Sequence, residues 1–333
     1  MRVLAITNMW PTVDAPHGGV HVRQMIQGLR DIGIEVELLF FDRRAKGKRI
    51  YRTVPRVVKE QLRTATFDVI HVAFGGIMAH LATRSARDFP SVVSFCGSDL
   101  LGEYHSGSRP KLSSRLSVWC SHRAARRASQ VIVKSSNLEH VLPDEVDRRK
   151  VQVIPNGVDM SQFKPADAEH CREQLGWDRE RFHVLFPANM GFAVKRPELA
   201  TAAVSRLTDR GMDVELHMLR GVKHADVSLH LNAADAVLLT SAHEGSPNII
   251  KEALACDRPI VSVDVGDVRS RIQSVNGCYI ADAGATDIAE KLAHVFESRQ
   301  AVSGREQIRE LAIETISQRI SQCYETAIEK FHA

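Results

Sequence analysis

The feature that most restricts the fold is a regular alternation of short apolar runs with longer amphipathic segments. Runs this short, and this rich in β-branched residues, are typical of strands buried on both faces of a parallel sheet. This order predicts an α/β fold built on a doubly wound, mostly parallel sheet. In the first half the expected strands are Val3–Thr7, Val36–Phe41, Val69–Val72, Val92–Phe95, Val131–Val133 and Val151–Ile154, and the expected helices include Val20–Ile32, Ile77–Arg87 and Ser113–Ala128.

The same alternation starts again in the second half of the chain. A stretch with Pro155, the pair Asn156-Gly157 and Pro165 separates the two series, and such turn residues mark a crossing from one sheet to another. At 333 residues the chain suits two domains of about 150 residues each, with the boundary near Pro165. The second series consists of strands Val184–Phe186, Val214–Leu219, Ala236–Thr240 and Pro259–Val263 and of helices such as Pro197–Leu207 and Ala225–Ala233.

Two carboxylates bracket the start of a predicted helix in the second half. The run Ala236–Thr240 ends in a loop that contains Glu244, and a helix follows with Ser246 as N-cap and Pro247 at its first position. Glu252 lies roughly 9 Å further along this helix, at about 1.5 Å per residue. The free backbone N–H groups at the start of a helix form a phosphate-binding site. A nucleotide-diphosphate sugar, with an anionic middle and hydroxyls at both ends, fits this layout.

The composition argues against a protein with a membrane-spanning helix and against a secreted protein. Apolar residues at 44% and charged residues at 25% are ordinary for a soluble globular chain, and no stretch approaches eighteen consecutive apolar residues. The N-terminus lacks the longer apolar segment of a signal peptide. The six cysteines are scattered without metal-ligand spacing, which predicts reduced thiols in a cytoplasmic protein.

Charge is unevenly distributed between the two halves. Residues 1–160 hold 24 Lys and Arg against 15 Asp and Glu, whereas the remainder has an acidic excess. The densest basic run is Arg43–Arg63, which reads either as a solvated surface loop or as an amphipathic segment on an anionic bilayer. It contains one aromatic residue, Tyr51, and no nucleic-acid-binding motif, so we expect no nucleic-acid partner. A second basic region, Arg109–Arg127, lies in the same half, and we favour peripheral contact with the inner face of the cell membrane.

The residues around the two carboxylates carry a family resemblance. Glu244 to Asn248 read E-G-S-P-N, Glu252 to Cys256 read E-A-L-A-C, and Arg258-Pro259-Ile260-Val261 follows. This run is similar to the E-x7-E segment of the GT-B glycosyltransferases of family 4. The resemblance implies two Rossmann-like domains with an interdomain cleft. It assigns residues 1–165 to an acceptor-side domain, 166–310 to a donor-binding domain and 311–333 to a helix that packs back on the first domain.

The resemblance also implies how the second domain holds a nucleotide sugar. Glu252 would bind the ribose hydroxyls, Glu244 would contact the sugar, and Lys195 would face the diphosphate. Asn189 occupies the position six residues before Lys195 where the family usually has Arg, so Arg196 would supply the second charge. Lys195 and Glu244 are the expected catalytic residues, and the expected donor-binding residues are Gly19, Asn189, Arg196, Gly245, Ser246, Pro247, Asn248, Ile249, Ile250 and Glu252.

On the acceptor side the resemblance is looser. The run F-C-G-S-D-L from Phe95 to Leu100 resembles the family's F-H-G-x-D-L, with Cys96 where His is frequent. Asp99 would orient an acceptor hydroxyl, although an Asp after a strand is more often a cap or turn residue. His71, which shortly precedes a glycine pair, is a further acceptor-side candidate.

The activity implied is retaining transfer of a sugar from a nucleotide-diphosphate sugar to a hydroxyl on a glycan or lipid-linked acceptor. The sequence contains no Asp-x-Asp, so neither a metal nor any other cofactor is expected. Two alternatives stay open. One is a non-catalytic partner of the same fold, suggested by Asn189 and Cys96. The other is a sugar-nucleotide 2-epimerase, an isomerase class that shares the GT-B fold.

Overall fold

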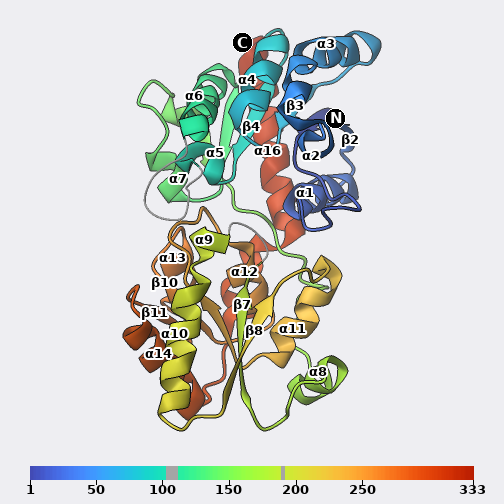
Figure 1. Cartoon of the computed structure of the whole chain (residues 1–333). Coiled ribbons are helices and arrows are strands. Elements are labelled where there is room, and N and C mark those ends of the chain that lie inside the picture. Colours follow the sequence, from blue (N-terminus) through green and yellow to red (C-terminus); the bar gives the residue numbers. More distant parts are fainter. Residues whose placement is uncertain (103–111, 189–191) are drawn as a thin grey trace. The chain divides into compact units, whose positions relative to one another are not determined.

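The computed structural model describes residues 1–102, 112–188 and 192–333, which form two compact units (Figure 1). Unit 1 comprises Met1–Gly157 together with Ile313–Ala333, and unit 2 comprises Val158–Ala312. The division falls at Gly157, whereas the turn residues placed it near Pro165. It falls there because the Val158 amide donates to the Leu311 carbonyl at 2.8 Å, which ties the start of the crossing segment to unit 2.

Unit 1 contains a six-stranded parallel sheet in the order β2-β1-β3-β4-β5-β6. The predicted α/β class is confirmed, and β3, β4 and β5 are buried at every residue, as strands in a parallel sheet are. Its strands are β1 (Arg2–Thr7), β2 (Glu35–Phe40), β3 (Val69–Val72), β4 (Ser91–Phe95), β5 (Gln130–Val133) and β6 (Val151–Val153). Its helices are α1 (Val20–Asp31), α2 (Arg43–Lys46), α3 (Val54–Thr64), α4 (Gly76–Ser85), α5 (Ser98–Leu101), α6 (Leu112–Arg127), α7 (Ser136–His140) and α16 (Ile313–His332), with 3-10 turns η1 (Gly47–Arg52) and η2 (Arg148–Lys150).

The basic run Arg43–Arg63 is folded structure rather than a loop. It forms α2, η1 and α3, and the side chains of Val54 and Val58 are fully buried in the core of unit 1. Val57 and Leu62 pack against the same core. The apolar face of this segment is therefore not available for insertion into a bilayer, and the amphipathic interpretation of it is wrong in that respect.

Unit 2 repeats the architecture with a five-stranded parallel sheet in the order β11-β10-β9-β7-β8. Its strands are β7 (Phe182–Pro187), β8 (Val214–Leu219), β9 (Ala236–Leu239), β10 (Ile260–Val263) and β11 (Tyr279–Ala281). Its helices are α8 (Ala168–Leu175), α9 (Phe192–Lys195), α10 (Pro197–Asp209), α11 (Val227–Ala233), α12 (Asn248–Ala255), α13 (Val268–Ile272), α14 (Ala285–Ser298) and α15 (Gly304–Gln307), with 3-10 turns η3 (His224–Asp226) and η4 (Arg309–Leu311).

Two features of the whole chain bear on function. Because all strands in each sheet are parallel, the loops after them gather at one edge, where open α/β sheets bind ligands. Across the described residues, each helix is too short or too polar to span a lipid bilayer.

Candidate functional site

At the carboxyl edge of the unit 2 sheet, hydrogen bonds join the loop after β9 to the segment that contains Lys195 and Arg196. The Thr240 hydroxyl, just after β9, donates to the carbonyl of Lys195 at 2.6 Å, and the Arg196 Nε donates to the Thr240 carbonyl at 2.6 Å. Arg196 adopts a left-handed backbone with φ of 52°, a conformation that costs energy for a residue with a side chain. These bonds hold the strained residue in place, and they position Lys195 over the loop that contains Glu244.

Lys195 and Glu244 form an ion pair. The Lys195 Nζ lies 2.5 Å from the Glu244 Oε1, and the Ser241 hydroxyl donates to the same oxygen at 2.8 Å. The side chains are 18% and 19% exposed, so the pair lies at the margin of the protein rather than in its core. The structure thus joins the two residues predicted to be catalytic, which are 49 positions apart in the sequence.

Helix α12 starts one residue later than predicted. Pro247 is the N-cap, because the Ser246 hydroxyl bonds to the Asp267 carboxylate at 2.9 Å instead of capping the helix. The Ile250 amide donates to the Pro247 carbonyl at 3.3 Å, so this N–H is used in the first turn and is not a free phosphate donor. Asn248 and Ile249 are the first two residues of the helix.

A glycine contact and a buried lysine fix the loop around Gly245. Gly266, at φ of 61°, packs so closely that a Cβ there would lie 2.5 Å from the Gly245 carbonyl oxygen. The Lys251 ammonium, buried in α12, donates to the Ser246 hydroxyl at 3.2 Å. The backbone of Gly245 and Ser246 is therefore held rigidly beside Glu244.

Glu252 has a partner that the sequence did not reveal. Its Oε1 lies 3.0 Å from the Nε2 of His224, in η3, and the carboxyl side chain is 9% exposed. The His224 ring packs edge-on against Phe163. The sequence shows that His224 follows the turn at Gly221 after β8, but nothing in its spacing predicts that it contacts Glu252.

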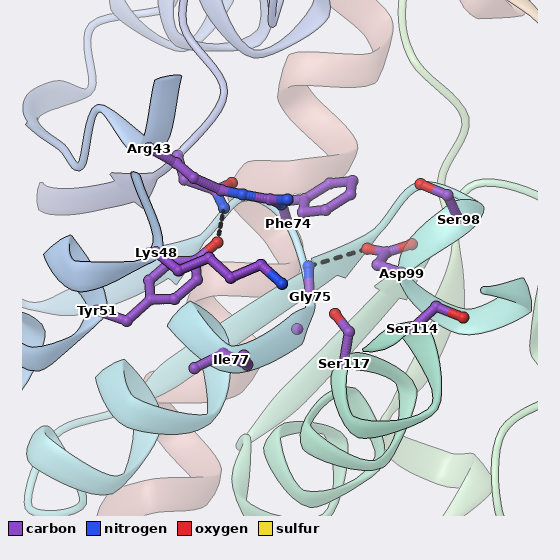
Figure 2. A pocket seen from close by; sticks show the side chains of 12 residues that line it. Arg43, Lys48, Tyr51, Phe74, Gly75, Ile77, Ser98, Asp99, Ser114 and Ser117 are labelled. Atoms are coloured by element: carbon purple, nitrogen blue, oxygen red, sulfur yellow. Dashed lines mark hydrogen bonds between the residues drawn. The ribbon is translucent and has the colours of Figure 1, made fainter. Parts of the chain in front are cut away.

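The carboxyl edge of the unit 1 sheet encloses a cavity of about 70 Å³ (Figure 2). Arg43 and Lys48 border it on one side, and Figure 2 shows the Lys48 side chain extending towards Gly75. Serine hydroxyls border the other side. The remaining lining residues are Asn8, Tyr51, Phe74, Gly76, Ile77, Ser98, Asp99, Ser114 and Ser117.

Asp99 borders this cavity but acts mainly as a turn residue. Its carboxylate accepts the amides of Gly75 at 2.9 Å and Gly97 at 2.8 Å, and also that of Cys96. Burial raises the pKa of Asp99, while these backbone hydrogen bonds oppose the shift. The carboxylate therefore ties the loop after β3 to the loop after β4, which is the turn alternative recognised in the sequence.

His71 is fully buried, and the expectation that it faces an acceptor is wrong for this structure. Its Nδ1 lies 2.6 Å from the Tyr324 hydroxyl in α16, and its Nε2 lies 2.7 Å from the Ser94 hydroxyl in β4. Burial, with a smaller contribution from Lys134, lowers the pKa of His71 to about 3. The neutral ring links the sheet of unit 1 to its last helix.

Cys96 and Gly19 lie in loops of unit 1 that follow β4 and β1. The Cys96 sulfur lies 3.8 Å from the Nε2 of His21. Gly19 begins α1 at φ of 74°, and a Cβ there would lie 2.3 Å from the Met9 carbonyl carbon, so only glycine fits.

Lys134, just after β5, is a buried residue that the sequence did not single out. Burial lowers the pKa of Lys134, and the nearby Cys96, Asp99 and Cys323 oppose that shift.

Asn189 lies outside the described residues, so its predicted place beside the diphosphate stays a prediction.

Two protein-family models together match most of the chain. Residues 18–162 match the model described as Glycosyltransferase Family 4, and residues 190–298 match the model described as Glycosyl transferases group 1. The chain belongs to the family 4 glycosyltransferases. The two matches correspond to unit 1 and unit 2, and the second one includes Lys195, Glu244 and Glu252.

Among family 4 relatives, the chain is 25% identical to the putative teichuronic acid biosynthesis glycosyltransferase TuaC of Bacillus subtilis, over 88% of each protein. It is 25% identical to the D-inositol 3-phosphate glycosyltransferase of Geodermatophilus obscurus over 59% of this chain, and the match spans 51% of that enzyme's length. The structure of Anabaena Alr3699/HepE in complex with UDP superimposes with a TM-score of 0.70 at 19% identity, over 97% of this chain and 99% of that one. This likeness shows the GT-B fold.

Proposed function

We propose that the protein transfers a sugar from a nucleotide-diphosphate sugar to a hydroxyl acceptor, with retention of anomeric configuration. The observation that carries the proposal is the ion pair of Lys195 and Glu244 at the carboxyl edge of the unit 2 sheet, beside the start of α12. The Lys195 ammonium, on a flexible side chain next to the start of a helix, suits a ligand with a diphosphate at its centre.

The nucleoside end of the donor binds at Glu252. Carboxylates accept hydrogen bonds from the vicinal hydroxyls of a ribose, and this carboxylate is held in a fixed orientation by His224 at 3.0 Å. The relative whose structure contains UDP supports a nucleotide ligand for this fold.

Lys195 changes partner when the donor arrives. Without ligand its ammonium contacts Glu244, and with ligand the diphosphate competes for it. Glu244 is then released to accept hydrogen bonds from the sugar hydroxyls. This exchange couples binding of the diphosphate to recognition of the sugar.

The chemical step breaks the bond between the anomeric carbon and the diphosphate oxygen. The acceptor oxygen forms its bond to the same carbon on the same face, and its proton goes to the departing phosphate oxygen. Negative charge grows on the leaving nucleoside diphosphate, so Lys195 and the guanidinium of Arg196 stabilise the transition state more than the ground state. Arg196 donates to neutral carbonyls of Thr240 and Ser241, which leaves its positive charge uncompensated by those partners. With two protein cations in this role, we propose a metal-independent reaction.

The acceptor binds in the cavity of unit 1. Arg43 and Lys48 offer cationic groups, and the hydroxyls of Ser98, Ser114 and Ser117 offer donors and acceptors. This lining suits a hydroxylated acceptor with an anionic group, such as a sugar joined to a lipid through phosphate. A glycan intermediate of the cell surface fits the same description.

Unit 1 contacts an anionic membrane through the exposed surface of α4 and α6. Trp119 is 47% exposed there, and the Arg123 guanidinium lies over its ring at 4.9 Å. Burial lowers the pKa of Arg127, and the neighbouring positive charges of Arg123 and Arg84 lower it further. Each basic residue near an anionic surface contributes about 1 kcal/mol. We therefore propose a peripheral position on the cytoplasmic face of the cell membrane.

Vesicle sedimentation at low salt tests the membrane proposal. Vesicles with anionic lipid should sediment the wild type, and reversing two charges with Arg84→Glu and Arg123→Glu should weaken partitioning at least 10-fold. Arg210→Glu, an exposed charge reversal in unit 2, is the control and should retain most of the binding. Equal binding by vesicles without anionic lipid would refute the electrostatic contact.

The proposed activity is tested with UDP-, GDP- and ADP-sugars. One donor should raise the melting temperature, because a ligand that binds only the folded state stabilises it. The same donor should yield free nucleoside diphosphate in the presence of an acceptor. A folded protein that binds none of these donors is a non-catalytic partner, and a donor converted to its epimer without acceptor identifies an isomerase.

A further inference from the structure

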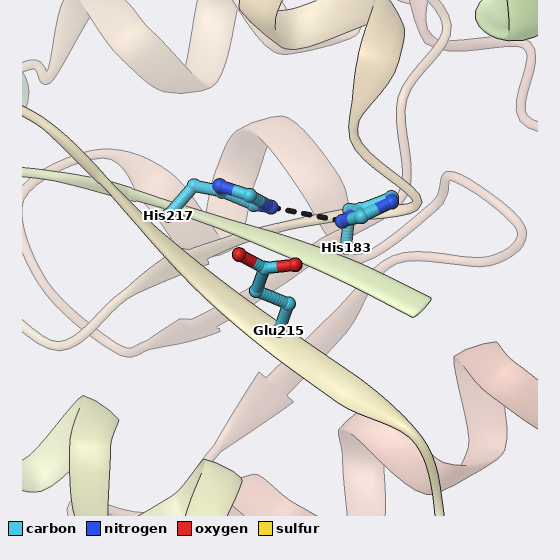
Figure 3. A group of neighbouring side chains, drawn as sticks. All are labelled: His183, Glu215 and His217. Atoms are coloured by element: carbon cyan, nitrogen blue, oxygen red, sulfur yellow. Dashed lines mark hydrogen bonds between the residues drawn. The ribbon is translucent and has the colours of Figure 1, made fainter. Parts of the chain in front are cut away.

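A cluster of two histidines and a glutamate lies on the unit 2 sheet, in a part of the fold that the proposed reaction does not use (Figure 3). His183 is near the start of β7, and Glu215 and His217 are on the neighbouring strand β8. The register pairs His183 with Glu215 and Leu185 with His217. Residues two apart on a strand face the same side, so Glu215 and His217 share one face of the sheet.

The potential ligand atoms of the three side chains converge. The Nδ1 of His183 lies 2.8 Å from the Nε2 of His217. One ring nitrogen of each histidine and a Glu215 carboxylate oxygen all lie within 4.8 Å of one another. At zinc–nitrogen distances of about 2.0–2.1 Å, two tetrahedral ligands are about 3.3 Å apart. A separation of the rings by roughly 0.5 Å therefore makes room for an ion.

A hydrogen bond to a backbone carbonyl sets the tautomer of His183. Its Nε2 lies 2.6 Å from the Asp178 carbonyl oxygen, and a carbonyl can only accept, so Nε2 carries the proton. The lone pair is then on Nδ1, which faces His217. Metal-binding histidines commonly donate their second N–H to a carbonyl or carboxylate in this way.

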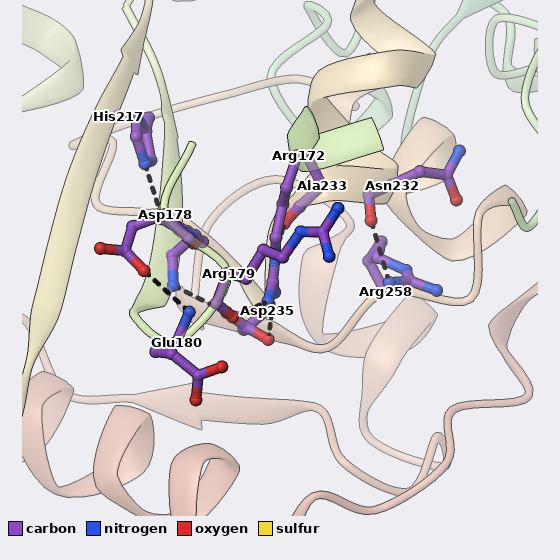
Figure 4. A network of polar contacts seen from close by, with 10 residues as sticks. Arg172, Asp178, Arg179, Glu180, His217, Asn232, Ala233, Asp235 and Arg258 are labelled. Atoms are coloured by element: carbon purple, nitrogen blue, oxygen red, sulfur yellow. Dashed lines mark hydrogen bonds and ion pairs between the residues drawn. The ribbon is translucent and has the colours of Figure 1, made fainter. Parts of the chain in front are cut away.

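A buried arginine fixes the segment that supplies this carbonyl (Figure 4). Arg172 donates to the carbonyls of Arg179 at 3.1 Å and Ala233 at 2.9 Å, and it pairs with Asp235 at 2.7 Å. The other oxygen of Asp235 accepts the His183 amide at 2.7 Å. One network thus positions both the backbone of His183 and the loop beside it.

Trp177 fixes the orientation of His217. The two rings are stacked with centroids 3.5 Å apart and planes inclined by 8°. Stacking covers the face of the imidazole and leaves its edge nitrogens directed in the ring plane, where a metal binds. His217 and Glu215 are both partly exposed, which gives an ion a path from solvent.

We propose that His183, Glu215 and His217 form a zinc-binding site. Two imidazoles and one carboxylate suit a borderline divalent ion such as Zn²⁺, with water in the fourth position, and they are poor ligands for Mg²⁺, which prefers oxygen atoms. Binding requires His217 to move its proton from Nε2 to Nδ1. Arg181 lies 3.6 Å from the Glu215 carboxylate but is closer to Asp213, at 3.1 Å, which compensates its charge.

The bound ion connects the edge strand β8 to β7. Among the described strands β8 is the last in the order of this sheet and pairs only with β7, so a metal bridge to β7 fastens an edge strand. His183 and Glu215 lie near the starts of their strands, whereas Thr240 and Glu244 follow the end of theirs. The site stabilises unit 2 without taking part in sugar transfer.

Equilibrium dialysis of the full chain without a histidine tag, followed by metal analysis, tests the site with Zn²⁺. The wild type should retain one Zn²⁺ per chain, and its melting temperature should rise by about 5 °C at saturating zinc. His217→Phe keeps the stacking on Trp177 but removes a ligand, and Glu215→Gln keeps the shape of the carboxylate. Each variant should lower zinc affinity by about 10–100-fold or more. Loss of an outer-shell contact already costs this much, and these variants alter a direct ligand.

His170→Ala is the matched control, because His170 is an exposed histidine of unit 2 on α8. It should bind zinc like the wild type, and Mg²⁺ in place of Zn²⁺ should leave the melting temperature unchanged. Circular dichroism confirms that each variant is folded. If the wild type retains no zinc, or if folded His217→Phe binds as tightly as His170→Ala, the cluster is only a hydrogen-bonded pair and the proposal is wrong.

Discussion

Two pairs of polar residues near the carboxyl edges of the two sheets, His71 and Asp99 in unit 1 and Lys195 and Glu244 in unit 2, have contrasting surroundings. In unit 1, His71 and Asp99 are buried, and their polar atoms are bonded to Tyr324, Ser94 and backbone amides. In unit 2, Lys195 and Glu244 are paired with each other at the margin of the protein, and we propose that a ligand replaces either partner. Polar residues in similar positions of the two sheets thus differ: His71 and Asp99 form internal contacts, whereas Lys195 and Glu244 form the pair that we propose a ligand exchanges.

This difference separates binding residues from structural ones. Removing a residue from the exchangeable pair should change catalysis and leave the fold intact. Removing a residue from the internal contacts should change stability and leave the chemistry of the folded molecules intact. The variants below test this separation in order of decreasing expected effect.

Lys195→Ala should lower turnover by about 100–1,000-fold, the loss seen when one group that stabilises transition-state charge is removed. Donor affinity should change less, because the charge on the diphosphate grows during the reaction. Steady-state kinetics separates kcat from KM, and Lys223→Ala, at an exposed lysine of unit 2, is the control. If only KM rises, Lys195 contributes uniform binding and its assignment as catalytic is wrong.

His71→Gln should destabilise unit 1 by about 3 kcal/mol, because two buried hydroxyl groups lose a partner at about 1–3 kcal/mol each. Urea denaturation measures this loss, and kcat per folded molecule should stay near the wild-type value. A large fall in kcat with unchanged stability would place His71 in the reaction after all.

The same histidine makes stability depend on pH. Its pKa is lowered to about 3 in the folded protein, so between the ordinary value of 6.5 and 3 the unfolded chain binds a proton that the folded chain does not. Its stabilising contribution is therefore complete above pH 6.5 and falls by about 1.4 kcal/mol per unit as the pH decreases. The free energy of unfolding of His71→Gln should decrease less steeply between pH 6 and pH 4. Parallel slopes would contradict the burial of a neutral ring.

Glu252→Ala should weaken donor binding by about 1.5–3 kcal/mol, the range for hydrogen bonds to a charged group. Calorimetric titration of the donor measures the change. Unchanged affinity in a folded variant would remove Glu252 from the nucleotide site.

His224→Ala should have the smallest effect, about 1 kcal/mol on donor affinity, because it orients the Glu252 carboxylate without touching the nucleotide. The effect should vanish when Glu252 is already alanine, and the double-mutant cycle measures this coupling. Additive losses would show that His224 binds the donor independently.

The sequence predicted the two parallel sheets and the position of Glu244 and Glu252 around α12, because strand–helix alternation is a local pattern. It did not predict that Lys195 contacts Glu244, since that pairing depends on the Thr240 hydroxyl holding two loops together. Nor could it show that His71 is buried, because its partner Tyr324 is 253 residues away. The basic run was misread for a similar reason, as the core that receives Val54 and Val58 is formed by distant strands.

The most direct test of the central claim is calorimetric titration of UDP, GDP and ADP into the wild type, Glu252→Ala and His71→Gln. One nucleotide should bind the wild type with a stoichiometry of one, bind His71→Gln with unchanged affinity, and bind Glu252→Ala about 10–150-fold more weakly, as a loss of 1.5–3 kcal/mol requires. If no nucleotide binds, or if His71→Gln weakens binding as much as Glu252→Ala does, the assignment of the donor site to unit 2 is wrong.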